Sequence, residues 1–148
     1  MSAPRGWPAT VGAVLADAGL MPRLLMVFVH DEPAGAAPLV AALARDGHDV
    51  AVARGEAPAL AAVRDARPDL VLLDTGEPGV DGLELLRRLR RDAQDLRVIV
   101  LTAAADVELA RMAIQLGAAD CLFTPVDPDR LRGAVERDLD SPPIAARR

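Results

Sequence analysis

The chain has 148 residues, of which 51% are hydrophobic but only 2% aromatic, and its formal net charge is −5. That length allows one domain with a proper core, filled by valine, leucine and alanine, and the negative charge without a basic, aromatic-rich patch argues against nucleic acid as a direct partner. The single cysteine, Cys121, excludes an internal disulfide and fits a reducing compartment. No apolar run approaches the roughly 20 residues that span a bilayer, and the one in residues 1–20 is too short for a signal peptide, so we expect a cytoplasmic protein without membrane contact.

Strand-like and helix-like segments alternate along the chain from residue 24 onward. Strands are expected at 24–29, 49–54, 70–73, 97–101 and 120–123. Helices are expected between and after them, around Pro38, Pro58, Leu83, Asp106 and Pro128. This alternation requires right-handed crossovers and a parallel sheet covered on both faces, which is a three-layer, doubly wound α/β domain. We assign the domain to residues 21–139, with extensions at 1–20 and 140–148.

Two helices carry more specific expectations. In the helix over 106–116, the spacing predicts that Val107, Ala110 and Ile114 face inward and that Gly117 stops the helix. In the helix that contains Leu83, a group of arginines lies mostly off the apolar stripe and predicts a solvated face. These arginines are Arg87, Arg88, Arg90 and Arg91.

The unbroken apolar run at 70–73 predicts a strand buried on both faces, and it ends in Asp74. Three strand ends would deliver polar groups to one rim of the sheet, namely Asp31, Asp74 and Thr102, and ligands bind at that rim in open α/β sheets. Two carboxylates with the backbone carbonyl of Gly76 are hard oxygen ligands that suit Mg²⁺. Such an ion would let the Asp74 carboxylate attack phosphorus as a nucleophile, and the Thr102 hydroxyl could donate a hydrogen bond to the phosphoryl oxygens.

At this point the sequence resembles the receiver domain of bacterial two-component response regulators. The resemblance covers about residues 23–139 and includes Leu-Met-Val-Phe-Val-His-Asp-Glu-Pro at 25–33. Its most specific part is Pro-Asp-Leu-Val-Leu-Leu-Asp at 68–74, followed by Pro-Gly-Val-Asp-Gly-Leu-Glu-Leu-Leu at 78–86. The segments 98–103 and 116–120 extend it in the family order.

The resemblance implies a flavodoxin-like (βα)5 domain with strand order 2-1-3-4-5 that acts in signalling and not as an enzyme. It implies that Asp74 accepts a phosphoryl group from a histidine kinase or phosphotransfer protein, with Asp31 and the Gly76 carbonyl on the metal side and Thr102 as the switch hydroxyl. Residues 140–148 are too short and polar to form an output domain, so the expected protein is a stand-alone receiver whose output is protein–protein contact. A homodimer or a downstream protein would use the face of the fourth helix, fifth strand and last helix. Charged candidates on that face are Arg111, Asp120, Arg132 and Arg137.

Several positions depart from the family pattern. His30 stands where the family usually has an acid, which should weaken Mg²⁺ binding because a neutral imidazole brings no charge and is a poor ligand for this hard ion. Thr124 replaces the family lysine that contacts the phosphoryl group, and the peptide bond after it is expected to be cis as in the family. Cys121 replaces the aromatic residue of the usual rotamer switch, and Thr75 and Glu77 replace apolar residues. The protein is therefore an atypical receiver.

The residues leave one alternative function open and disfavour two others. The departures leave open a phosphorylation-independent pseudo-receiver that serves as a protein-docking module. A flavodoxin-type cofactor binder is disfavoured, because Asp31 and Glu32 would repel a phosphate and Pro33 lacks an N–H. An aspartyl phosphohydrolase would need a second acid two positions after its nucleophile, and Gly76 occupies that position.

Overall fold

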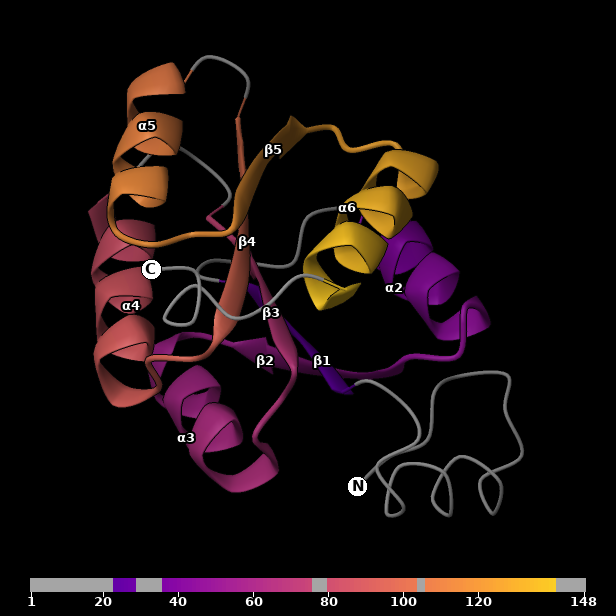
Figure 1. Cartoon of the computed structure of the whole chain (residues 1–148), viewed down its shortest axis with the longest axis horizontal. Coiled ribbons are helices and arrows are strands. Elements are labelled where there is room, and N and C mark those ends of the chain that lie inside the picture. The colour runs from indigo at the N-terminus through magenta and orange to yellow at the C-terminus, as the bar shows by residue number, and fades with distance from the viewer. Residues whose placement is uncertain (1–22, 29–35, 76–79, 104–105, 141–148) are drawn as a thin grey trace.

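The computed structural model describes residues 23–28, 36–75, 80–103 and 106–140, and the strands among them form one parallel sheet (Figure 1). The strands are β1 (Arg23–Phe28), β2 (Asp49–Arg54), β3 (Leu70–Asp74), β4 (Arg97–Ala103) and β5 (Asp120–Thr124). Their order is β2-β1-β3-β4-β5, so the expected fold and strand order are confirmed. The two expected extensions lie almost entirely outside the described residues.

Helices cover both faces of this sheet and make the expected three layers. They are α2 (Ala36–Arg45), α3 (Glu56–Ala66), α4 (Val80–Asp92), α5 (Val107–Gln115) and α6 (Pro128–Asp140). The helices α3, α4 and α5 pack on one face, at the left of Figure 1, and α2 and α6 pack on the other. Within the described ranges, every helix is too short or too polar to cross a membrane.

Alternation along the central strands divides the core into two halves. Val71 and Leu73 face the layer of α3, α4 and α5, whereas Leu70 and Leu72 face α2 and α6. All five residues of β3 are buried, as expected for a strand with no polar alternation. The strand therefore carries its terminal residue, Asp74, to the edge of the sheet from the middle of the core.

Helix ends follow local capping chemistry. The Asp106 carboxylate accepts a hydrogen bond from the Leu109 amide and caps α5, and Asp127 does the same for the Asp129 amide at 2.8 Å before α6. The helix expected to open at Pro58 begins two residues earlier, at Glu56. Gly55, with a φ of 92°, makes that start possible because glycine tolerates the left-handed region.

The expected inward face of α5 is wrong for Val107 and Ile114, whereas Ala110, its third residue, is half-buried. Val107 and Ile114 are 66% and 48% exposed, while Leu109 and Ala113 are buried against the sheet. Both sets of residues have helical spacing, so the sequence pattern was compatible with either face. The packing of the helix on β4 and β5 selected the second.

The expectation of a solvated arginine face on α4 holds for three arginines but not for Arg90. Arg87, Arg88 and Arg91 are exposed or half-exposed and pair with acids, whereas the Arg90 guanidinium donates a hydrogen bond to the Leu96 carbonyl. Arg90 is also packed against Gly117, where an added Cβ would lie 2.9 Å from its Nε atom. This arginine therefore ties α4 to the start of β4 and to the turn before β5.

Candidate functional site

The site is centred on Asp74, the last residue of the middle strand. Asp74 is 4% exposed and pairs in register with Phe28, the last described residue of β1, and with Leu101 of β4. Strand order reverses between β1 and β3, so this carboxylate lies at the topological switch point, on the carboxyl edge of the sheet. Open α/β domains bind their ligands at this place.

Thr102 is on the neighbouring strand β4, one residue beyond Leu101, the register partner of Asp74. It is fully buried. Its hydroxyl has no hydrogen-bond partner among the described residues. Burying a hydroxyl without a hydrogen-bond partner destabilises the folded state by about 1–3 kcal/mol. An acceptor oxygen of a ligand at this edge could therefore accept a hydrogen bond from a donor that is already in place.

Thr75 extends the same edge toward α4. Its amide and its hydroxyl both donate hydrogen bonds to the Leu101 carbonyl oxygen, and each donor–acceptor distance is 3.0 Å. An added Cβ at Gly82, in the first turn of α4, would lie only 2.4 Å from the Thr75 Cγ2 atom. The first turn of α4 thus lies so close to the end of β3 that only glycine fits at position 82. Gly82 of the sequence motif therefore has a packing role.

The fifth strand brings two of the atypical residues to the same sheet. Thr124 is half-buried, pairs with Ala103 of β4, and is followed by a cis peptide bond to Pro125, as expected. Cys121 is half-buried against the core, and burial, assisted by Asp120 and Asp106, raises the pKa of its thiol to about 11. Its thiol therefore stays protonated at neutral pH, and Cys121 is a small strand residue packed against the core.

The proposed metal ligands are divided between described and undescribed parts of the chain. His30, Asp31 and Gly76 lie outside the described residues, and Asp74 is the ligand whose place is known. In the part of the chain that the structure describes, no group of three or more His, Cys, Asp or Glu side chains could hold a metal ion. The donor chemistry nevertheless fits Mg²⁺, because a buried carboxylate at the strand end is a hard oxygen ligand that this ion prefers.

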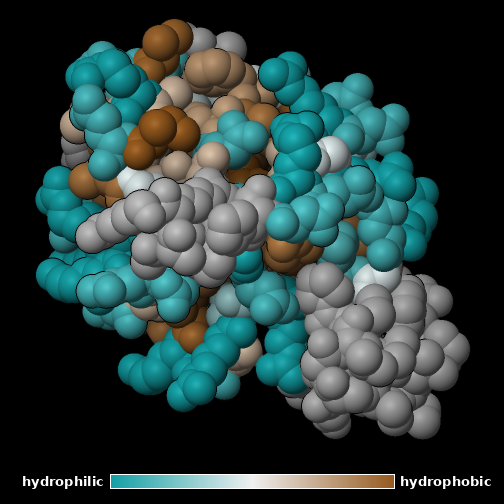
Figure 2. All heavy atoms as spheres, viewed as in Figure 1, coloured by the Kyte–Doolittle hydropathy of each residue, from teal (hydrophilic) through white to brown (hydrophobic). Residues whose placement is uncertain are grey.

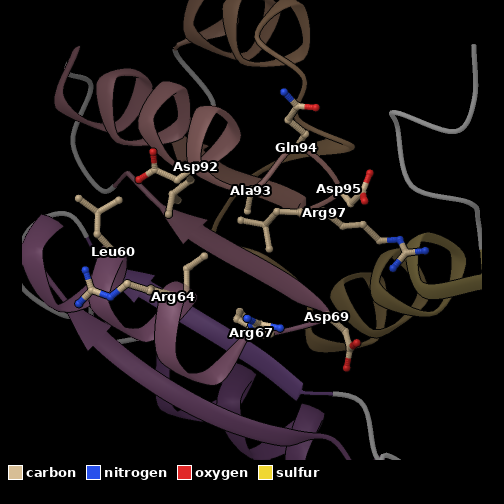
Figure 3. A pocket seen from close by; sticks show the side chains of 13 residues that line it. Leu60, Arg64, Arg67, Asp69, Asp92, Ala93, Gln94, Asp95 and Arg97 are labelled. Carbon is tan, nitrogen blue, oxygen red and sulfur yellow. The ribbon is translucent and has the colours of Figure 1, made fainter.

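A hollow of about 830 Å³ lies at the opposite edge of the sheet, where α3 and α4 end and β3 and β4 begin (Figure 3). Its lining includes three arginines and three aspartates, so its charge is balanced. These residues are Arg64, Arg67, Asp69, Asp92, Asp95 and Arg97. The amino edge of the strands is not where doubly wound domains place their reactive site, and we assign no chemistry to this hollow. The sequence did not indicate it, because its walls come from two separate stretches of the chain, residues 60–69 and 89–97.

Fold and site together define a class of protein: a doubly wound α/β domain that presents a buried carboxylate at the switch point of its sheet. Residues 26–136 match the family model of the response regulator receiver domain, and the chain belongs to this family. It is thus a receiver domain of the response-regulator type, a component of two-component signalling, as the sequence motifs indicated. Such domains are signalling proteins rather than classical enzymes.

Two response-regulator relatives illustrate how the chain compares with longer and shorter proteins that carry this domain. The DNA-binding response regulator MtrA of Mycolicibacterium smegmatis is 36% identical over 124 residues, which cover 81% of this chain and 54% of MtrA. The chain therefore spans about half the length of MtrA. Sporulation initiation phosphotransferase F of Bacillus subtilis is 37% identical over 95 residues, 64% of this chain and 77% of that protein.

Solved structures agree with the described fold. A response regulator from Thermotoga maritima has a TM-score of 0.74 and 31% identity, and the match covers 82% of this chain and 100% of that one. The receiver domain of NtrX from Brucella abortus has a TM-score of 0.72 and 33% identity, with 80% and 98% covered.

Proposed function

We propose that Asp74 is the phosphoacceptor of this receiver and that its output is contact with another protein. The observation that carries the proposal is the buried Asp74 carboxylate at the sheet switch point, with the unpartnered hydroxyl of Thr102 on the neighbouring strand, one residue beyond the register partner of Asp74. A carboxylate oxygen attacks phosphorus, and the bond from phosphorus to the donor imidazole of a histidine kinase or phosphotransfer protein breaks. The imidazole leaves with the bonding electron pair and takes up a proton, while the Thr102 hydroxyl donates to a phosphoryl oxygen.

Mg²⁺ would be held by Asp31, Asp74 and the Gly76 carbonyl. When bound, the ion screens the negative charge of the carboxylate from that of the incoming phosphoryl group. Because His30 adds no negative charge at this site, we expect the ion to bind more weakly than with two adjacent acids. Thr124 cannot supply the positive charge of the lysine it replaces, so Thr102 remains the main described donor to the phosphoryl oxygens.

Intact mass spectrometry tests the proposal directly. The full chain is incubated with acetyl phosphate and Mg²⁺, and we expect the mass of one phosphoryl group to be added. Asp74→Asn keeps the size of the side chain but removes the nucleophilic oxygen, so it should show no added mass. The hydroxylamine lability of the adduct identifies it as an acyl phosphate. An unmodified wild-type chain at high donor and Mg²⁺ concentrations would overturn the proposal.

The second candidate is a pseudo-receiver that docks to a protein without taking phosphate. It is favoured by the protonated Cys121 thiol in place of an aromatic switch and by Thr124 in place of lysine. In this second candidate, Asp74 and Thr102 are structural residues at the carboxyl edge of the sheet, and the domain keeps a single conformation. The mass experiment separates the two candidates, because only the first adds a phosphoryl group.

The surface that supports protein contact is formed by α5, β5 and α6. Large apolar side chains are exposed there, and Figure 2 shows hydrophobic atoms gathered at the surface around α5 and β5. These side chains are Val107, Met112, Ile114 and Phe123. Large apolar side chains exposed near one another on a surface are a feature of interaction sites. We propose it as the contact face for a second copy of the chain or for a downstream protein.

The charged residues expected on this face are mostly engaged within the domain. Arg111 pairs with Glu108 on its own helix, and Arg137 lies 3.9 Å from Asp120. The Arg132 guanidinium binds both carboxylate oxygens of Asp46, at 2.7 Å each, and so connects α6 to α2. Arg132 therefore stabilises the opposite side of α6, and the contact face depends mainly on its apolar residues.

A further inference from the structure

Thr75, the residue directly after the phosphoacceptor, makes an unusual pair of hydrogen bonds. Its amide and its hydroxyl both donate to the Leu101 carbonyl oxygen, each at 3.0 Å, and its side chain is buried. The amide bond continues the pairing of β3 with β4 and is open to any residue except proline. The hydroxyl bond requires serine or threonine, so it depends on the identity of this residue.

The carbonyl that Thr75 holds belongs to the peptide unit that joins Leu101 to Thr102. Because a peptide unit is planar, fixing the direction of its carbonyl also fixes the direction of the Thr102 amide and limits where the Thr102 side chain departs. The Thr102 hydroxyl is buried without a hydrogen-bond partner among the described residues. Its direction is therefore not set by a bond of its own but by the backbone that carries it.

The other branch of the Thr75 side chain is fixed by α4. The Cγ2 methyl group lies where it would come within 2.4 Å of a Cβ at Gly82, so the methyl group and the helix are in close packing. Packing on one side locks the χ1 rotamer of a β-branched residue, and the hydroxyl is then held toward Leu101. One side chain thus connects the ends of β3 and β4 to the start of α4.

We propose that Thr75 is a positioning residue that acts through Thr102, holding the switch hydroxyl beside Asp74 by anchoring the peptide between Leu101 and Thr102. This rests on the proposed role of Asp74 as phosphoacceptor. Thr75 departs from the family pattern. An apolar residue at this position could not perform this function, because it has no hydroxyl to donate to Leu101. Removing the Thr75 hydroxyl should therefore slow phosphoryl transfer only as long as Thr102 has its own hydroxyl.

The first test is a double-mutant cycle on the full chain, with acetyl phosphate as the donor and acetate as the leaving group. Thr75→Val keeps the shape of the side chain and removes its hydroxyl, and we expect the initial rate of phosphorylation to fall about fivefold, the value of one net hydrogen bond. Thr75→Ser keeps the hydroxyl and should stay within about twofold of wild type. In a Thr102→Ala background, Thr75→Val should change the rate by less than about twofold.

A variant in the other half of the core controls for loss of stability. Val135→Ala removes buried methyl groups that contact α2 and the far face of the sheet, and its phosphorylation rate should equal that of the wild type. An equal loss from Thr75→Val in both backgrounds would show that Thr75 is only structural and would overturn the inference. Should Thr75→Val not fold, Thr75→Ala replaces it in the cycle.

The second test does not use phosphate. Amide NMR spectra of the unphosphorylated chain should show that Thr75→Val moves the Thr102 resonance, whereas Thr75→Ser leaves it near its wild-type position. An unmoved Thr102 amide in Thr75→Val overturns the inference. A wild-type chain that takes no phosphate overturns the role of Asp74 instead, and the NMR comparison still decides whether Thr75 positions Thr102.

Discussion

At the scale of a single residue, the pKa of His48 depends on its burial in the folded protein. It lies between α2 and β2, is buried, and its Nδ1 atom has no hydrogen-bond partner in the described part of the chain. Burial lowers the pKa of its imidazole, and this outweighs the opposing effects of Asp46 and Glu136. The folded protein therefore holds His48 neutral at a pH where the unfolded chain would already protonate it.

This residue predicts a pH dependence of stability. A histidine whose pKa is depressed on folding destabilises the protein as the pH falls below its unfolded value of about 6.5, and each pKa unit corresponds to about 1.4 kcal/mol. We expect the free energy of unfolding, measured by urea denaturation, to decrease from pH 7 to pH 5. His48→Leu should flatten this part of the profile. His30→Gln, at the other histidine, should retain it, and an unchanged slope in His48→Leu would contradict the assignment.

Asp46, a charged neighbour of His48, affects the stability of the protein only at lower pH. The hydrogen bonds from Arg132 hold the pKa of its carboxyl below the usual value of 3.8, so the bond between α2 and α6 persists until the solution is strongly acidic. Its stabilisation is complete above the unfolded pKa and is lost only as the pH falls through the lower folded value. It therefore does not contribute to the slope between pH 7 and pH 5.

At the scale of elements, α5 separates core residues from surface residues that look alike in the sequence. Leu109 and Ala113 are buried, and Val107 and Ile114, two residues before and one after them, are exposed. The helix is capped by Asp106 and packs between β4 and β5, so its rotation is set by these contacts and not by the number of apolar residues on each face. The exposed set is then free to contact another molecule.

A matched pair of substitutions tests this rotation. Leu109→Ala should lower the free energy of unfolding by about 2–4 kcal/mol because it leaves a cavity in the core. Ile114→Ala removes a half-exposed side chain and should cost less than about 1 kcal/mol. Urea denaturation at pH 7 measures both, and equal losses would mean that α5 is rotated from the orientation described.

For the whole molecule, the important asymmetry is between the two edges of the sheet. The β5 edge joins the apolar surface of α5, whereas the β2 edge exposes one large apolar side chain among the described residues, Val52. Only the first edge thus combines a strand with an apolar helix surface. Such a combination favours association of a second copy or of a partner protein.

Self-association can be tested with one substitution on each edge. We expect the average mass from sedimentation equilibrium to rise with concentration for the wild-type chain. Ile114→Glu should return it to the monomer mass, because a charge at the centre of the contact would be buried without a partner. Val52→Glu, a matched change on the β2 edge, should behave like the wild type. A wild-type chain that stays monomeric at every concentration would leave only a downstream protein as the occupant of this face.

The sequence by itself determined the parallel α/β fold, the central strand and the position of Asp74 and Thr102 at strand ends. These features depend on local patterns: apolar runs of strand length, glycine and proline between them, and polar residues where a strand stops. The family motifs then implied the strand order, which the structure confirms, and the site roles that we propose for these residues. Tertiary structure alone decided which face of α5 is buried, that Thr75 bonds to Leu101 across 26 positions, and that Arg132 reaches Asp46 across 86. Such contacts join segments far apart in the chain, and neither composition nor periodicity records which of several compatible side chains will meet.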